Sequence, residues 1–136
     1  LSSMRMCANV PCQSAIQTAL GGYQSIDDLV KENGRLRIQR DVTTDMLNGI
    51  DGISCVKPKG AMYCFAKVDE KKFNIQNDEQ MVLDLLSSEK ILLVHGRAFN
   101  LTEGTYFRLV FLPHSDVLVP ALHRIGNFFR TYKQGA

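Results

Sequence analysis

One charged residue interrupts the most strand-like segment of this chain. Residues 106–112 read YFRLVFL, so Arg108 stands alone among aromatic and aliphatic side chains. Because side chains alternate between the two faces of a strand, Phe107, Leu109 and Phe111 are expected to face the core. Arg108 is then expected to face away from it, and an isolated guanidinium in such a place needs a partner.

Two kinds of partner suit this arginine. A guanidinium is planar, keeps its charge, and binds a carboxylate through two parallel hydrogen bonds. One interpretation is an edge-strand arginine paired with an internal Asp or Glu, and the strand by itself favours this pair. The other is an arginine that binds the carboxylate of a ligand, which other parts of the chain must support.

Composition limits the classes of protein to consider. The chain has 136 residues, of which 45% are hydrophobic and 22% charged, as in one soluble globular domain. Its net charge of +2 comes from scattered residues without a basic run, so nucleic acid and anionic membranes are not expected partners. No apolar run approaches the ~20 residues of a membrane span.

Cysteines and histidines give no sign of a metal site. They are Cys7, Cys12, Cys55, Cys64, His95, His114 and His123. The cysteines lack C-x-x-C spacing and the histidines form no close cluster with them, so no metal is expected. Cys64 lies in an apolar strand and resembles a small buried hydrophobic residue, which favours reduced thiols and a cytoplasmic location.

Apolar spacing and end signals predict the helices. The first is expected to begin near Pro11 and to end at Gly21-Gly22, and a second helical region opens at Ser25. Beyond Gly34 an amphipathic helix is predicted to pack through Ile38, Val42, Met46 and Ile50.

Two further helices are predicted in the second half of the chain. One begins after a capping box formed by Asn77 and Gln80 and ends at Lys90. Another is capped by Ser115 or Asp116, and Pro120 favours Asp116 because proline is tolerated only near a helix start. Its expected buried stripe is Leu118, Leu122, Ile125, Phe128, Phe129 and Tyr132.

Four strands are predicted among these helices. Segments 53–57 and 61–68 form a hairpin joined tightly by residues 58–60, and segment 91–94 is a strand buried on both sides. With the Arg108 strand, the order predicts an α/β fold: a small, mostly antiparallel sheet covered by helices on one face. Tyr63 is expected on the other, open face beside Tyr106.

Four short segments follow one another along the chain: ANVP at 8–11, KGAMYCF at 59–65, VHGRAF at 94–99 and FRL at 107–109. Each is common by itself. Their order and spacing resemble the C-terminal part of class I pyridoxal-phosphate aminotransferases. Their residues are most similar to those of the alanine aminotransferase branch. The resemblance covers nearly the whole chain.

The resemblance implies roles for particular residues. Arg108 matches the family's strand arginine that holds the α-carboxylate of amino-acid and 2-oxo-acid substrates. Arg5 and Asn9 match a segment near the dimer interface and the neighbouring active site. The segment with Tyr63 is expected to build the sheet only. His95 stands where many relatives have proline, and we expect a solvated or backbone-bonded loop histidine.

The resemblance also implies a larger enzyme. Residues 1–136 would be one C-terminal small domain of fold type I, with 1–23 as an interdomain or interface segment. Pyridoxal 5'-phosphate would be held mainly by a preceding large domain, because no lysine here matches the family's Schiff-base motif. The first residue is Leu1, and we expect a piece of a longer, homodimeric enzyme, with no catalytic residue in this part and no activity alone.

The residues and the resemblance together allow three functions. The first is transfer of an amino group between an amino acid, alanine by resemblance, and 2-oxoglutarate. The second is a free-standing regulatory domain that binds an amino or keto acid through Arg108. The third is an aminotransferase for aspartate, aromatic or branched-chain substrates.

Overall fold

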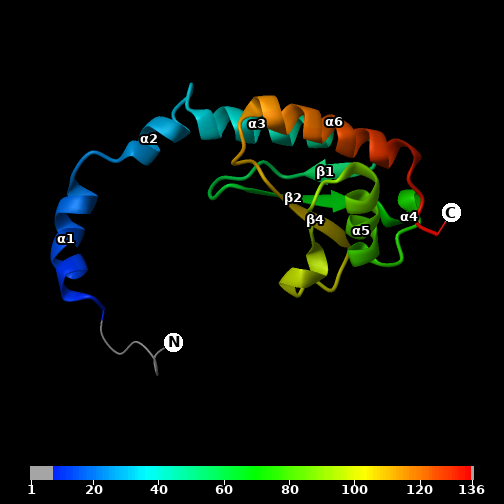
Figure 1. Ribbon diagram of the computed structural model, residues 1–136, viewed down its shortest axis with the longest axis horizontal. Coiled ribbons are helices and arrows are strands. Elements are labelled where there is room, and N and C mark those ends of the chain that lie inside the picture. The colour runs from blue at the N-terminus through cyan, green and yellow to red at the C-terminus, as the bar shows by residue number, and fades with distance from the viewer. Residues whose placement is uncertain (1–7, 136) are drawn as a thin grey trace.

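A computed structural model describes residues 8–135, which form a four-stranded antiparallel sheet with helices packed on one face (Figure 1). The predicted fold class is confirmed. The elements are α1 Val10–Gly21, α2 Ser25–Val30, α3 Arg35–Asn48, β1 Ile53–Cys55, β2 Tyr63–Val68, α4 Glu70–Phe73, α5 Asp78–Glu89, β3 Val94–His95, the 3-10 helix η1 Gly96–Phe99, β4 Thr105–Val110 and α6 Ser115–Thr131.

The sheet has the strand order β1-β2-β4-β3, with every neighbouring pair antiparallel. Alternation along β4 follows the prediction, since Phe107 and Leu109 are buried beneath the helices while Arg108 faces the other way. The opposite side, here called the open face, carries Tyr63, Phe65, Lys67, Tyr106, Arg108 and Val110. Helix η1 lies against part of this face, where Phe99 contacts Phe65.

The core lies between the sheet and helices α3, α5 and α6, which run over the same side of it (Figure 1). In α6 the predicted apolar stripe is confirmed: five of its residues are buried and Tyr132 packs against them. In α5 the predicted cap is also confirmed, because the Asn77 side chain accepts hydrogen bonds from two backbone N–H groups. Lys90 ends α5 in the left-handed conformation, with φ of 55°.

Helix α3 packs only partly as predicted: Met46 and the following Ile50 pack half-buried against the core, but the fully buried residues are others. Its buried residues are Gln39, Thr43, Thr44 and Leu47, whereas Ile38 is 45% exposed. Gln39 is buried because its side-chain amide donates to the carbonyl oxygens of Leu112 and Pro113 at the end of β4. A hydropathy pattern misses such a helix face, since a polar side chain with partners replaces an apolar one.

Two strand predictions need correction. The hairpin of β1 and β2 exists, but its connection is the long loop 56–62 rather than a tight turn at 58–60. Val56 is 89% exposed at the start of this loop. Segment 91–94 is mostly irregular, because the left-handed Lys90 redirects the chain and Leu92 is 75% exposed. Only Val94 and His95 pair, as a short edge strand.

The start of α6 also differs from the prediction. The helix begins at Ser115 after His114, and no side chain caps it. Pro120 lies inside the helix instead of in its first turn. Its missing N–H removes one hydrogen bond to the carbonyl four residues earlier, and the buried aromatic residues farther along stabilise the helix despite this loss.

Helices α1 and α2 form an arm that extends away from the sheet (Figure 1). The first helix begins at the predicted place, with Pro11 in its first turn, and ends at Gly21. Neither helix contains a buried residue. The exposed apolar residues of the arm are Val10, Ile16, Leu20, Tyr23, Ile26 and Val30. Within residues 8–135, no helix combines the length and apolar character needed to cross a membrane.

Candidate functional site

Arg108 occupies a central strand of the sheet. Across the two ladders its direct neighbours are Phe65 on β2 and Val94 on β3. The interpretation of Arg108 as an edge-strand residue is therefore wrong. A strand paired on both sides fixes the Cα and Cβ positions of its residues, so Arg108 leaves the sheet at a well-defined place on the open face.

Two aromatic rings enclose the Arg108 guanidinium. Its Cζ atom lies 4.6 Å from the centre of the Tyr63 ring and 4.4 Å from the centre of the Phe99 ring. Such contacts contribute from ~0.5 to about 2 kcal/mol, and more as the cation is desolvated. Phe65 supports this arrangement, because it contacts Phe99 edge-on at 5.8 Å and stacks on Tyr106 at 5.2 Å.

No acidic side chain of residues 8–135 neutralises this guanidinium. The ion pairs in that range involve other basic residues, and the Nε atom of Arg108 is buried without a hydrogen-bond partner. Of the two interpretations of this arginine, the internal Asp or Glu partner is therefore not found within residues 8–135. The carboxylate of a ligand stays a prediction.

The sequence predicted the correct face of the sheet for Tyr63 but not the residue that it contacts. Tyr63 shares the open face with Tyr106, as predicted, but Phe65 lies between them along β2. Tyr63 contacts Arg108 instead. Phe99 was missed altogether as a site residue, because it follows β3 on η1 and reaches Arg108 only through the fold.

A second charged cluster lies where β3 joins η1. The carboxylate of Asp78, at the start of α5, accepts a hydrogen bond of 2.9 Å from the backbone N–H of Arg97. His95 Nδ1 is 3.6 Å from the same carboxylate and has no hydrogen-bond partner within residues 8–135. His95 is half-buried beside an acid, so the expectation of a solvated or backbone-bonded loop histidine is wrong.

The two remaining candidate residues belong to the N-terminal segment. Asn9 is exposed and caps α1, since its side-chain oxygen accepts a hydrogen bond of 3.3 Å from the N–H of Cys12. This local role accounts for an asparagine at that position. Arg5 lies outside the described residues.

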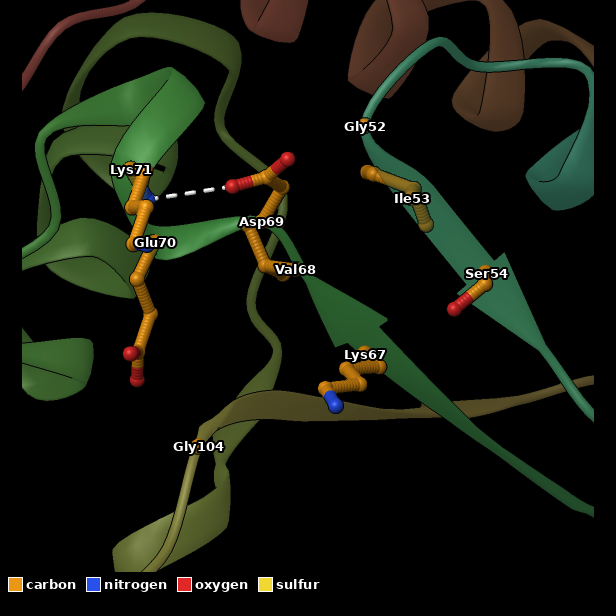
Figure 2. Close-up of a pocket in the computed structure, with 9 residues that line it drawn as sticks. All are labelled: Gly52, Ile53, Ser54, Lys67, Val68, Asp69, Glu70, Lys71 and Gly104. Atoms are coloured by element: carbon orange, nitrogen blue, oxygen red, sulfur yellow. Dashed lines mark hydrogen bonds between the residues drawn. The ribbon is translucent and has the colours of Figure 1, made fainter.

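A cavity of about 520 Å3 lies beside β1 and the end of β2, next to the start of α4 (Figure 2). Its lining is Gly52, Ile53, Ser54, Lys67, Val68, Asp69, Glu70, Lys71 and Gly104. The Asp69 carboxylate already has a partner in the protein, because it accepts a hydrogen bond of 3.0 Å from the backbone N–H of Lys71 (Figure 2). Glu70 accepts another of 3.0 Å from the Thr105 hydroxyl. Arg108 does not line this cavity.

The cysteines of the sheet belong to the core and not to the open face. Cys55 and Cys64 are buried beneath the helices, and Cys12 is exposed on the arm; all three are free thiols. The neighbouring Cys64 thiol lowers the pKa of Cys55, whereas the Cys55 thiol and burial raise the pKa of Cys64.

Known proteins resemble this chain along almost all of its length. The family model for aminotransferase class I and II matches residues 2–125. A glutamate-pyruvate aminotransferase, AlaA, of Haemophilus influenzae is 55% identical over 98% of the chain. An alanine aminotransferase of Mycobacterium tuberculosis is 54% identical over 98% of it. The chain covers 33% and 31% of these two proteins, so it spans about a third of their length.

Solved structures agree with the sequence relatives. An aminotransferase from Escherichia coli matches with a TM-score of 0.88 and 52% identity, over 98% of this chain and 33% of the other. An alanine aminotransferase from Pyrococcus furiosus matches with a TM-score of 0.78 and 34% identity, over 95% and 32%. The chain therefore belongs to the class I and II aminotransferase family.

Proposed function

We propose that this chain is the substrate-carboxylate-binding part of an enzyme that transfers an amino group between alanine and 2-oxoglutarate. One observation carries the proposal: the Arg108 guanidinium contacts the rings of Tyr63 and Phe99 and has no acidic partner in residues 8–135. The relatives named glutamate-pyruvate and alanine aminotransferase support alanine as the amino donor.

Arg108 acts by binding and orienting the α-carboxylate. The rings of Tyr63 and Phe99 restrict rotation of the guanidinium, which leaves β4 on the open face. A carboxylate that accepts two parallel hydrogen bonds from this fork is fixed in position and in plane. Donor amino acid and acceptor 2-oxo acid share that group, and a single arginine serves both.

The family depends on pyridoxal phosphate, which supplies the electron sink for amino-group transfer. No lysine of this chain matches the family's Schiff-base motif, and the cavity that Lys67 and Lys71 line does not include Arg108. We therefore assign to this chain the binding of the substrate carboxylate, and to the rest of the protein the binding of the cofactor.

The length of the relatives bears on the alternatives. Because this chain covers about a third of them, an enzyme with a further domain is favoured over a free-standing regulatory domain that binds amino or keto acids. Specificity for aspartate or a related acid is the second candidate. A probable aspartate/prephenate aminotransferase of Rhizobium leguminosarum is 36% identical over 85% of the chain, well below the 55% and 54% of the two relatives named glutamate-pyruvate and alanine aminotransferase.

We further propose that the whole protein is a cytoplasmic homodimer with α1 near the subunit interface. The absence of any buried residue in α1 and the free thiols support these proposals. Asn9 then serves the interface indirectly, by capping the helix that meets the second subunit. Arg5 keeps the role of an interface residue from the sequence resemblance alone.

An assay of the full-length protein tests the function. Alanine, aspartate, tyrosine and leucine are compared as amino donors to 2-oxoglutarate, and alanine is expected to give the highest kcat/KM. A higher value for aspartate, tyrosine or leucine would replace alanine in the proposal. Binding of alanine without any amino transfer would support the regulatory domain instead.

A further inference from the structure

A buried carboxylate fastens the segment that carries Phe99. Asp78 is 3% exposed, and its Oδ2 atom accepts the hydrogen bond of 2.9 Å from the N–H of Arg97. The Nε atom of Arg97 lies 3.5 Å from Oδ1, and His95 Nδ1 lies 3.6 Å from Oδ2. One carboxylate thus joins the start of α5 to the start of η1.

The helix start does not itself require this carboxylate. Asn77 already caps α5, because its side-chain oxygen accepts hydrogen bonds of 2.9 and 3.2 Å from the N–H groups of Glu79 and Gln80. Glu79 supplies a first-turn acid that remains exposed. Burial of a carboxylate is costly unless partners compensate it. The Arg97 N–H on η1 supplies a partner for Oδ2, whereas Oδ1 has no hydrogen bond within residues 8–135 and only the Arg97 side chain nearby.

Helix η1 is also packed closely against β4. A Cβ atom added at Gly96 would lie 3.1 Å from Cβ of Tyr106, so the backbone approaches this strand more closely than a larger residue allows. Attached to α5 at one end and packed on β4, η1 has little freedom to shift. Phe99 is its last residue, and the ring reaches within 4.4 Å of Arg108 Cζ.

We propose that Asp78 is a positioning residue for the substrate carboxylate: by holding the Arg97 N–H it sets η1 and places the Phe99 ring against Arg108. The effect on substrate rests on the proposed function, whereas the placement of the ring rests on geometry alone. Without the Asp78 carboxylate, η1 is released from α5 and the ring no longer restricts the guanidinium. The substrate must then order Arg108 itself, and binding weakens.

Fluorine NMR of the full-length protein, with para-fluorophenylalanine at position 99, tests the placement of the ring without any assay of activity. Asp78→Ala is expected to shift or broaden the resonance, because the ring leaves the guanidinium. Glu79→Ala is the matched control, since it removes a neighbouring first-turn acid that does not touch η1. An unchanged resonance in Asp78→Ala would overturn the proposal.

Asp78→Asn decides the question if Asp78→Ala does not fold. Asparagine keeps one oxygen to accept the Arg97 N–H and loses the charge that faces the Arg97 side chain. We expect a smaller displacement of the same fluorine resonance. A resonance identical to that of the unsubstituted protein would count against a role of the carboxylate in setting η1.

A double-mutant cycle on KM then tests whether Asp78 affects substrate binding through Phe99. Asp78→Ala is expected to raise KM for alanine and pyruvate about three- to thirtyfold, with a smaller change in kcat. In a Phe99→Leu background the same substitution should change KM little, because the ring through which it acts is gone. An equal effect in both backgrounds would mean that Asp78 does not act through Phe99.

Failure of the proposed function gives a different pattern. The unsubstituted protein would then not transaminate alanine, and the substrate role of Asp78 would fall with the function. The fluorine resonance would still shift in Asp78→Ala if the carboxylate positions the ring.

Discussion

Arg108 keeps its charge in surroundings that supply two rings and, within residues 8–135, no counter-ion. Aromatic faces hold a guanidinium without consuming its N–H donors, since they attract the cation through the ring quadrupole. An acidic neighbour would occupy the same donors. The side chain is thereby oriented and still able to bind an incoming carboxylate.

The residue-scale prediction is that Arg108→Lys in the full-length enzyme lowers kcat/KM for every substrate that carries an α-carboxylate. Lysine retains the charge and loses the planar fork, so one of two charge-assisted hydrogen bonds disappears. We expect a loss of roughly 1.5–3 kcal/mol, or about ten- to a hundredfold in kcat/KM, for alanine and 2-oxoglutarate alike. Steady-state kinetics with both substrates measures it.

Arg124→Lys is the matched control for this change. Arg124 pairs with Glu89 on the surface, with its side chain 47% exposed, and should leave the kinetics unchanged. If Arg108→Lys stays within about twofold of the unsubstituted enzyme, Arg108 is a structural strand residue and the central assignment is wrong.

Gly52 gives a second prediction at this scale. It has φ of +91°, and an added Cβ would lie 2.7 Å from the Phe73 ring. Gly52→Ala should lower the free energy of unfolding by at least about 2 kcal/mol, from backbone strain and overpacking together. Gly60→Ala is the control, because nothing lies within 4 Å of its Cβ position, and it should change stability by less than about 0.5 kcal/mol. Urea unfolding followed by circular dichroism compares them, and equal costs would contradict the steric account.

The sequence was informative about Arg108 and much less so about its surroundings. Strand alternation alone predicted the face on which Arg108 lies, because that rule is local. The contacts with Phe99 and the anchor at Asp78 join segments that are distant along the chain. Phe99 belongs to the VHGRAF segment at 94–99, yet no spacing rule relates an aromatic residue after one strand to an arginine on another strand.

Among the elements, those with strong apolar periodicity were predicted well. Helix α6 buries its expected stripe, and α5 begins and ends at the expected residues. Prediction failed where tertiary contacts outweigh local pattern. Gln39 is buried on α3 because two backbone carbonyls need donors, and segment 91–94 stays irregular because the left-handed Lys90 redirects the chain.

Helices α5 and α6 provide the element-scale prediction. The Tyr132 hydroxyl donates a hydrogen bond of 2.7 Å to the Asp84 carboxylate. Tyr132→Phe should lower the free energy of unfolding at neutral pH by about 1–2 kcal/mol, because a charged acceptor loses its donor. Tyr23→Phe on the exposed arm is the control, and thermal or urea unfolding measures both.

The same pair predicts a pH dependence. Burial and the hydrogen bond to Asp84 raise the pKa of Tyr132 above its usual value of about 10. The folded protein therefore favours the protonated phenol, and this stabilisation is complete below about pH 10 and is lost as the pH rises above it. The stability difference between the unsubstituted protein and Tyr132→Phe should accordingly shrink in that alkaline range. A difference that stays constant there would contradict the pKa shift.

For the whole molecule, the arm of α1 and α2 matters most. Its apolar side chains are exposed, with Leu20 at 73% and Ile26 at 50%, although the sheet and its three helices form a complete core. Contiguous exposed apolar surface marks a place of contact with other protein. The relatives, about three times as long, contain enough additional chain to cover it.

The 136-residue chain alone is therefore predicted to self-associate through the arm. Its weight-average mass in sedimentation equilibrium should rise with concentration, because association removes apolar surface from water. Replacing Ile16 and Leu20 by serine should reduce the rise, whereas Gln17→Ser on the same helix should not. A chain that stays monomeric and highly soluble at all concentrations would contradict this prediction.

Helix α1 has twelve residues and none of them is buried. A helix of that length is marginal in water when only its own backbone hydrogen bonds stabilise it. Its order is therefore tied to whatever covers it, and the helix content of this segment becomes a reporter of assembly. A spectroscopic label on α1 would report when the remainder of the protein has docked, from a position outside the sheet that carries Arg108.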